Sequence, residues 1–390
     1  MQNIFLLGLV SFFVDLSTEM VYPLIPLYLV SVLGATPVLV GIIEGVAESV
    51  ASLLKVFSGY FTDKYQHKKP LAFAGYSASV FYKIGLLLAF SWTGILAARV
   101  IDRIGKGIRT TPRDVLVSES AAKGSMGKSF GVHKALDMAG SALGILIAYL
   151  LLSSSGSSSF NYQRLFGISI IPAVLGLAVL LFVKEQKQPR PERIREPFWQ
   201  RFKELDSNLK LYLLVSFIFT LGNSSNTFLL LRAKSIGFTD TNVVLLYLLF
   251  NITAALLSIP FGKLSDKIGR KKLLVGGYLA FAAVYLGFAL VSNTAVMVII
   301  FIVYGFYTAS TAGVERALIA EISPPELKGT MLGLQSTLVG IALLPASVIA
   351  GLLWNAFGPF APFSFGAILA LTAAVLLGRL LHTGVEQKLA

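Results

Sequence analysis

Cysteine is absent from this sequence of 390 residues, histidine occurs only 3 times, and charged residues make up only 14% of the chain. Without cysteine, disulfides, thiolate metal sites and thiol catalysis are all excluded. The small charged fraction, beside 55% hydrophobic residues, leaves too little polar surface to cover a soluble globule. We therefore predict a protein embedded in lipid.

Long hydrophobic runs are what the sequence has instead. Runs of about 20 residues match the length of a membrane-spanning helix, whereas a β-barrel strand needs only about 10 alternating residues. The predicted fold class is an all-α membrane protein, because helices satisfy every backbone polar group in lipid. Pro23 and Pro26 should bend the first span. Twelve transmembrane helices are predicted, at 4–32, 38–61, 71–91, 93–111, 128–152, a sixth ending near 183, 211–231, 241–261, 273–292, 295–314, 330–354 and 360–380.

The chain is a tandem of two similar halves. The charged stretch 59–71, GYFTDKYQHKKPL, returns at 262–274 as GKLSDKIGRKKLL, and Leu9–Phe12 recurs as Leu214–Phe217. Between the halves, the composition shifts abruptly to lysine, arginine, glutamate and proline. We expect a first bundle at 1–183, a cytoplasmic linker at 184–210 and a second bundle at 211–390.

The net charge of +13 reflects topology, because most lysines and arginines lie in short links between spans. The links after even-numbered spans are basic, whereas those after spans 1, 3, 9 and 11 carry no charge. By the positive-inside rule both termini are cytoplasmic, and Arg232 and Lys234 at the outer end of span 7 are exceptions. The first run lacks the basic start and the cleavage site of a signal peptide. We predict a multi-pass protein of the cytoplasmic (inner) membrane, with lipid as a partner and no nucleic acid.

Each charged hairpin can act as a latch between the halves. A carboxylate such as Asp63 or Asp266 at a helix end accepts hydrogen bonds from the first N–H groups of a neighbouring helix and from a nearby arginine, but only while the halves are closed on that side. The alternative is that these are ordinary positive-inside charges. The predicted cytoplasmic gate comprises Gly59, Asp63, Lys68, Arg113, Asp114, Gly262, Asp266, Arg270, Lys271, Glu315 and Arg316.

The hairpins at Gly59–Lys69 and Gly262–Lys272 resemble the cytoplasmic signature of the major facilitator superfamily, Gly-x-x-x-Asp followed by basic residues. The sequence Pro23-Leu24-Ile25-Pro26 is similar to the proline motif of that superfamily's first span, and Arg99 falls where its span-4 motif has an arginine. Gln66-His67 departs from the Gly-Arg expected in the first hairpin. The resemblance implies two six-helix bundles around a central cavity, which rock between inward-open and outward-open states.

Charged side chains inside the first six spans are spaced at three and four residues, so each set forms a stripe on one helix face. Burying such a group in lipid costs from about 2.5 to more than 10 kcal/mol, so these residues face a cavity or pair with each other. Spans 1, 2 and 4 place their charges at overlapping depths, where they can meet. The predicted cavity residues are Asp15, Glu19, Glu44, Glu48, Arg99, Asp102, Arg103, Asp137, Asn223, Asn226 and Asn251.

We interpret the first half as the carrier of titratable groups, and the second as a polar and aromatic wall that includes Tyr247, Tyr304 and Tyr307. Two other interpretations remain open. The charges can form fixed salt bridges that only hold the bundle together. Alternatively, the carboxylates can bind a metal, although neighbouring arginines and the lack of a His-x-x-x-His pair argue against a metal site.

Span 5 contains Gly140-Ser141-Ala142-Leu143-Gly144, a spacing of small residues that lets two helices approach closely. It resembles the glycine-rich span-5 motif of drug/proton antiporters, but Ile145 stands where that motif has proline. More often such spacing serves plain helix packing.

The resemblance and the intramembrane charges together predict a monomeric secondary transporter without a cofactor, which uses a proton gradient to export a drug-like molecule or metabolite by antiport. Alternatives are a proton-coupled importer of a polar or anionic solute, an exporter of a divalent metal or metal chelate, and a receptor that does not transport. The sequence contains no phosphate-binding loop, so we do not expect ATP to be the energy source. It also contains no nucleophile arrangement that would indicate an enzyme.

Overall fold

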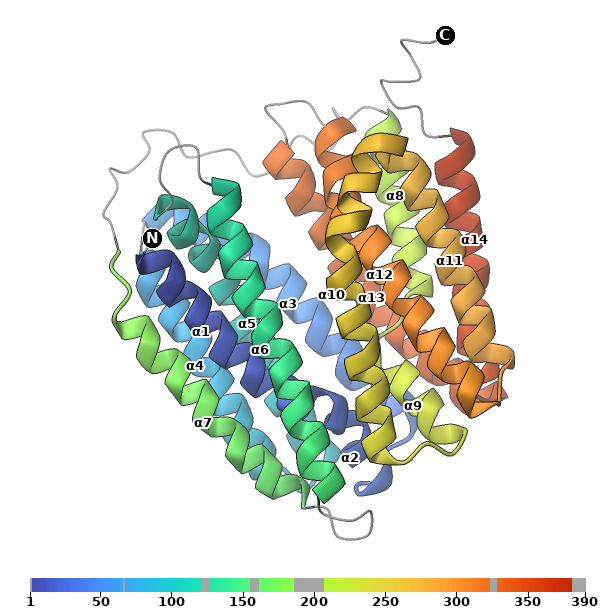
Figure 1. Ribbon diagram of the computed structural model, residues 1–390, viewed down its shortest axis with the longest axis horizontal. Coiled ribbons are helices and arrows are strands. Elements are labelled where there is room, and N and C mark those ends of the chain that lie inside the picture. The colour runs from blue at the N-terminus through green and yellow to red at the C-terminus, as the bar shows by residue number, and fades with distance from the viewer. Residues whose placement is uncertain are drawn as a thin grey trace. The chain divides into compact units, whose positions relative to one another are not determined.

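The structure, a computed structural model, describes residues 2–65, 67–120, 126–154, 161–185, 207–322 and 328–380, without the side chains at 56, 59–65, 118, 126–131, 259, 263, 266, 312, 316–317, 320–321, 328–330, 332–333 and 380. Within these ranges the chain forms 14 α-helices and one 3₁₀ helix, and no strand (Figure 1). The prediction of an all-α protein is confirmed.

Six spans make up each half of the described chain. In the first half they are α1 Gln2–Val21 with η1 Tyr22–Leu24 and α2 Ile25–Ser31, then α3 Pro37–Tyr65, α4 Lys68–Leu87, α5 Trp92–Glu119, α6 Met126–Ser154 and α7 Tyr162–Leu181. In the second half they are α8 Ser207–Gly222 with α9 Thr227–Ser235, then α10 Asp240–Ile268, α11 Arg270–Leu290, α12 Thr294–Ile322, α13 Lys328–Phe357 and α14 Phe360–Leu380. The twelve predicted spans are therefore present, and ten of them are long and apolar enough to cross a membrane. The other two are α4 and α5.

The first and seventh spans are each interrupted. Pro23 lies in the 3₁₀ turn η1 and Pro26 in the first turn of α2, because a proline has no N–H to continue the helical ladder. The predicted bend is found at this place. In the seventh span the polar residues Asn223–Asn226 separate α8 from α9, since short polar side chains compete with the helical hydrogen bonds of the backbone.

The helix α5 extends well beyond its predicted end at residue 111. Arg113, Asp114 and Glu119, expected in a link, lie in its last turns, and Pro112 is inside the helix. Proline removes the hydrogen bond to the carbonyl four residues earlier, here that of Ile108. The Ser58 hydroxyl of α3 donates to this carbonyl at 2.6 Å, so the helix continues through the proline.

Both charged hairpins are shorter than predicted. In the first, α3 ends at Tyr65 and α4 begins at Lys68; in the second, α10 and α11 are separated only by Gly269. The backbone of Gly269 has a φ of 93°, a conformation that glycine adopts without steric cost. The lysines and arginines of the hairpins therefore lie in the last turns of α3 and α10 and in the first turns of α4 and α11, and not in loops.

By their contacts the helices divide into two compact units, one of Met1–Ile194 with Phe238–Leu248 and one of Arg195–Gly237 with Leu249–Ala390. The linker predicted at 184–210 falls mostly on residues outside the described ranges. In the first unit α1 packs along α6 and α7, and α5 packs against α3 and α4. A Cβ added to Gly140 would lie 2.2 Å from the backbone oxygen of Phe12, so α1 and α6 touch backbone to backbone.

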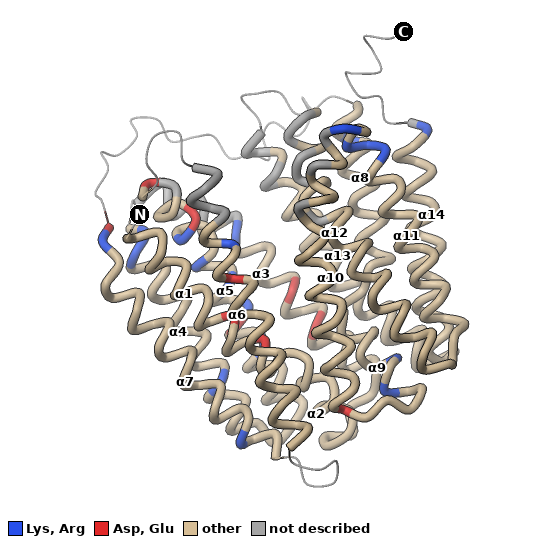
Figure 2. The backbone as a smooth tube through the Cα atoms, in the orientation of Figure 1, with Lys and Arg blue, Asp and Glu red and all other residues tan. Residues whose placement is uncertain are grey.

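The second unit has an aromatic core. The helix α8 packs against α13 and α14, and α11 packs against α12 and α14. The rings of Phe219 and Tyr278 stack with centroids 3.9 Å apart, and Phe281 and Tyr285 stack at 3.8 Å. Figure 2 shows the contrast with the first unit: acidic and basic residues occur midway along the helices of the first unit, whereas α11 and α14 are free of them over most of their length.

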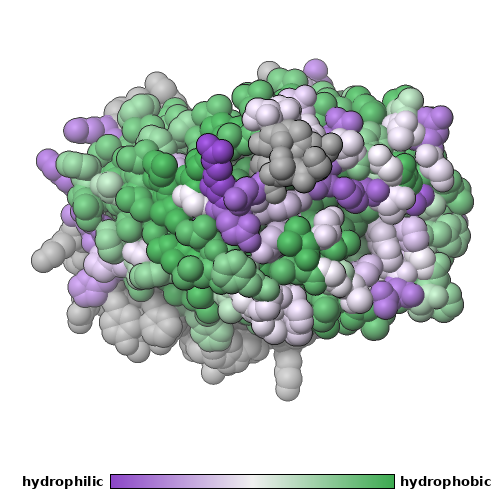
Figure 3. All heavy atoms as spheres, turned by 90° about the horizontal axis from the view of Figure 1, so that it is seen from below, coloured by the Kyte–Doolittle hydropathy of each residue, from purple (hydrophilic) through white to green (hydrophobic). Residues whose placement is uncertain are grey.

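Large apolar side chains cover much of the surface. Phe90, Leu256 and Phe357 are 74%, 71% and 75% exposed. On the face shown in Figure 3, which is seen from below, hydrophobic residues alternate with hydrophilic and intermediate ones. Large apolar side chains exposed to this extent suit contact with lipid and not with water.

Candidate functional site

A cavity of about 170 Å³ lies in the first unit, among the charges that the sequence singles out. Tyr247 reaches it from the start of α10, which belongs to this unit by its contacts. Four carboxylates and three cations share its wall. The residues that line it are Asp15, Thr18, Glu19, Tyr22, Glu48, Asp102, Arg103, Lys106, Arg109 and Tyr247.

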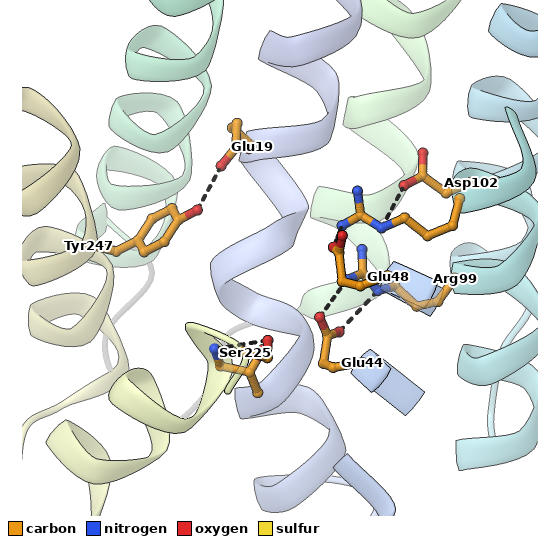
Figure 4. Close-up of polar contacts among 9 residues, drawn as sticks. Glu19, Glu44, Glu48, Arg99, Asp102, Ser225 and Tyr247 are labelled. Carbon is orange, nitrogen blue, oxygen red and sulfur yellow. Dashed lines mark hydrogen bonds and ion pairs between the residues drawn. The ribbon is translucent and has the colours of Figure 1, made fainter. Parts of the chain in front are cut away.

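Two parallel ion pairs join α3 to α5. Glu44 accepts from Arg99 through both carboxylate oxygens, with distances of 3.1 Å from Nε and 2.6 Å from Nη2. One turn further along both helices, Glu48 and Arg103 pair at 2.8 Å. The four-residue spacing within each helix places both pairs on facing stripes, and Figure 4 shows Glu44 and Arg99 pointing toward each other.

The two pairs differ in their access to the cavity. Glu44 and Arg99 are buried and do not line it, whereas the Glu48 side chain is 30% exposed and does. A buried bidentate pair is strongly destabilised by removal of one partner. The Glu44–Arg99 pair therefore matches the structural interpretation of the charges, and the Glu48–Arg103 pair borders the space where a solute or water can enter.

Asp102 is the least satisfied group of the cavity. Its carboxylate is 1% exposed, and neither oxygen has a hydrogen-bond partner among the described residues. Among the described residues, Asp102 forms an ion pair with Arg103, in which its Oδ2 lies 3.8 Å from Arg103 Nε. Nη1 of Arg109 is likewise buried without a hydrogen bond. A buried polar atom left unpaired costs about 1–3 kcal/mol, so this wall has unused capacity to bind a polar ligand.

On α1, two carboxylates face the cavity. Glu19 accepts a hydrogen bond from the Tyr247 hydroxyl at 3.2 Å (Figure 4), and Asp15 lies one turn earlier. The ring of Tyr22 packs against that of Tyr247, with centroids 5.7 Å apart. The sequence interpretation placed Tyr247 in the wall of the second half, but the structure places its side chain against α1.

Lys83 is a buried cation that the predicted site does not include. It is 0% exposed on α4 and donates to Thr18 Oγ1 and Ser79 Oγ, each at 2.9 Å. Among the described side chains it forms no ion pair. The signal in the sequence is a lysine in the middle of an apolar span, a position where a charge needs a functional or structural reason. Lys106 and Arg109, further along the stripe of α5, are also missing from the predicted cavity residues.

Asp137 lies on α6 beside α1. It pairs with Lys134, three residues earlier on the same helix, and its side chain is 16% exposed. The neighbouring His133 is buried and hydrogen-bonded to Ser11 Oγ at 2.9 Å. The structure therefore brings Asp137 to the side of α1 that carries Asp15.

The predicted polar residues of the second unit meet its tyrosines. Asn223 donates to the Tyr307 hydroxyl at 3.0 Å, and the Tyr304 hydroxyl donates to Asn226 Oδ1 at 2.7 Å. Both asparagines lie in the break between α8 and α9, which turns their amides toward α12. Asn251 lies half-buried on α10.

The predicted gate residues are only partly described. Asp63, Asp266 and Arg316 have side chains outside the described set, so the latch stays a prediction. Arg113 binds the carboxylate of its neighbour Asp114, at 2.8 Å from Nη2. In the second unit Glu315 accepts from the Tyr278 hydroxyl at 3.2 Å.

Lys68, also predicted for the gate, is buried at the start of α4. It pairs with Glu119 of α5, and its N–H donates to Glu185 at 2.7 Å. The remaining gate residues are placed on helices: Gly59 near the end of α3, Gly262 near the end of α10, and Arg270 and Lys271 half-buried in the first turn of α11.

No group of three or more His, Asp or Glu side chains within the described residues is arranged to hold a metal ion. Arginine and lysine side chains separate the carboxylates of the cavity, and a cation in their midst would be repelled.

Twelve spans in two similar halves, with a charged cavity in the first unit, define a membrane protein of the secondary-transporter class. A profile of the Major Facilitator Superfamily matches residues 7–232 and 211–389, and the chain belongs to this family. An uncharacterised MFS-type transporter of Methanocaldococcus jannaschii is 38% identical over 382 residues, which cover 96% of this chain and 94% of the relative.

Two further comparisons extend this result. The fosmidomycin resistance protein of Escherichia coli is 25% identical over 316 residues, 78% of this chain and 74% of that protein. The crystal structure of a nucleoside transporter superposes with a TM-score of 0.80 at 12% identity, covering 96% of this chain and 98% of the other. At this identity the superposition shows the fold, which is the predicted fold of the superfamily.

Proposed function

We propose that this protein is a proton-coupled secondary transporter that exports a small polar solute or drug-like molecule in exchange for protons. The observation that carries the proposal is the cavity of the first unit, where neither oxygen of Asp102 has a hydrogen bond among the described residues and Arg109 Nη1 is likewise without one. A set of charges serving only to hold helices together would leave no such capacity. The Glu44–Arg99 pair fulfils that structural role, and Glu48 and Asp102 are the groups that exchange protons.

The transport cycle follows from the two similar halves. The bundles at 1–183 and 211–390, joined by the segment 184–210, rock about a central site, and the hairpins at Asp63 and Asp266 latch them on one side. The positive-inside distribution supports a cytoplasmic membrane location with both termini in the cytoplasm. As in the superfamily generally, a monomer is sufficient for this cycle.

Export is supported by the relative named for fosmidomycin resistance. A second candidate is proton-coupled import of an anion, which is favoured by the three cations Arg103, Lys106 and Arg109 in the cavity wall. Export of a divalent metal is less favoured, because the described carboxylates form no group fit to hold one.

Purified protein in proteoliposomes tests the proposal. A thermal-shift screen over metabolites, drugs and metal ions first identifies a solute that binds. An imposed pH gradient then drives that solute toward the acidic compartment if transport is antiport, and toward the alkaline compartment if it is symport. Flux that ignores the gradient contradicts proton coupling, and binding without any flux indicates a receptor.

A further inference from the structure

The helices α1 and α6 lie side by side in a fixed register. A Cβ added to Gly140 or Gly144 would lie 2.2 Å from Phe12 O or 2.4 Å from Leu16 O, so the two backbones are in direct contact. The bond between Ser11 Oγ and His133 Nε2 joins residues 122 positions apart. One turn further along both helices, the same offset brings Asp15 opposite Asp137.

At this position the two carboxyl groups lie within hydrogen-bonding reach of each other. An ionised carboxylate has only acceptors, so a hydrogen bond between two carboxyl groups requires that one of them carries a proton. Two bare carboxylates in contact would repel each other strongly away from water. Two carboxyl groups placed in this way can share one proton between them.

The two members of the pair face different surroundings. Asp15 lines the cavity, where Lys106 and Arg109 of α5 stand in the same wall. Asp137 pairs with Lys134, whose side chain is 66% exposed. A proton on Asp15 that bonds to ionised Asp137 leaves each group with a partner: Asp15 donates to Asp137, and Asp137 accepts from Lys134.

We propose that Asp15 and Asp137 bind one shared proton, and that this pair is a proton-binding site of the transporter in addition to Glu48 and Asp102, with Lys134 as the counter-ion of Asp137. This assignment of the coupling proton rests on the proposed function. On release, the O–H bond of Asp15 breaks, the proton passes to water in the cavity, and Asp15 becomes a carboxylate facing Lys106 and Arg109. Asp137 remains a carboxylate and keeps its pairing with Lys134.

Helices α1, α4, α5 and α6 carry charged groups near the pair, whereas α7 carries none there. Arg164 is the only charged residue of α7. It lies far from Asp15, because its neighbour Gln163 donates a hydrogen bond to Tyr28, 13 residues further along the first span. The remaining titratable and charged groups near the pair are Glu19 on α1, Lys83 on α4, Lys106, Arg109, Arg113 and Asp114 on α5, and His133 and Lys134 on α6.

Infrared spectroscopy of the purified full-length protein tests the pair, because a protonated carboxyl group has its own C=O stretching band. At neutral pH we expect Asp15→Asn and Asp137→Asn each to lose the band intensity of one carboxyl group. The double variant should lose no more than either single variant, since one proton is shared. Glu185→Gln, which keeps the acceptor for the Lys68 N–H, is the matched control and should leave the band unchanged.

Loss of two carboxyl groups in the double variant, or no loss in either single variant, overturns the proposal. A second variant covers the case in which the aspartate variants do not fold. Lys134→Gln removes an exposed cation that stabilises ionised Asp137, so the band should persist to higher pH, whereas Lys134→Arg should leave its pH range unchanged. If the carboxyl band of the Lys134→Gln variant disappears over the same pH range as that of the wild type, the proposal is also overturned.

The measurement needs neither a solute nor a gradient. A protein that shows the shared proton but no proton-driven flux contradicts the proposed function and leaves the pair intact. A protein with proton-driven flux but without the shared proton contradicts the pair alone.

Discussion

Arg99 of α5 holds Glu44 of α3 through two hydrogen bonds, and neither side chain reaches solvent (Figure 4). One turn away, Arg103 binds Glu48 at the edge of the cavity. The same pair of residue types thus occurs twice on the same two helices, once sealed in the bundle and once open to a solute. This difference in access gives the two pairs different consequences when they are broken.

Replacement of Glu44 by Gln should destabilise the protein by about 3–5 kcal/mol, because it leaves the Arg99 guanidinium buried without its counter-charge. Glu48→Gln should cost no more than about 1 kcal/mol, as expected for a partly exposed pair. Thermal unfolding of the purified variants measures the difference. The double variant Glu44→Leu with Arg99→Met should recover much of the lost stability. A Glu44→Gln variant with the same melting temperature as the wild type would contradict the structural role of the pair.

Substitution of Gly140 or Gly144 by Ala should separate α1 from α6. The added Cβ would meet the backbone of Phe12 or Leu16, which cannot move aside as a flexible side chain can. Overpacking of this kind costs about 1–3 kcal/mol or more, and the yield of monodisperse protein should fall. Gly167→Ala on α7 is the control, because its Cβ would meet only Leu87 Cδ1 at 3.9 Å. Equal yields and melting temperatures for the three variants would show that the close contact is not needed.

Arg232, an exception to the positive-inside pattern, caps the end of α11. Its guanidinium donates to the carbonyl oxygens of Phe288 at 2.7 Å and Val291 at 2.9 Å, and the side chain is 7% exposed. Because a hydrogen bond from a charged group contributes about 1.5–3 kcal/mol, Arg232→Ala should lower the melting temperature clearly. Arg232→Lys should restore only part of it, since an ammonium lacks the planar fork of donors. Lys234→Ala, on the same helix, is the control, and a drop as large as that of Arg232→Ala would refute the capping role.

The sequence predicts the fold well because its main signals are local. Apolar runs set the twelve spans, and the repeated hairpins reveal the two halves. The C-terminal end of α5 was missed, because the predicted span stopped just before Pro112 and the Ser58 hydroxyl that binds the freed carbonyl comes from another helix. The bend of the first span was predicted, because Pro23 and Pro26 disturb their own backbone. The break at Asn223–Asn226 was not, because the seventh span was predicted as one helix over 211–231.

The charges of the site are equally visible in the sequence, but their partners are not. Helical spacing puts Glu44 and Glu48 on one stripe and Arg99 and Arg103 on another, which is why these four could be expected to meet. Which of the two pairs is sealed depends on packing between helices. The position of Lys83 against Thr18, and the contact of Asp15 with Asp137, likewise depend on the register of neighbouring helices, which no spacing within one span encodes.

The central claim is that acids of the first-unit cavity, Asp102 among them, couple solute movement to protons. The most direct test records the pH inside proteoliposomes when a transported solute is added to wild type, Asp102→Asn and the Glu185→Gln control. We expect a solute-evoked pH change for wild type and the control, and none for Asp102→Asn, which should still bind the solute and remain folded. An Asp102→Asn protein that moves as many protons for each solute molecule as the wild type would contradict the account.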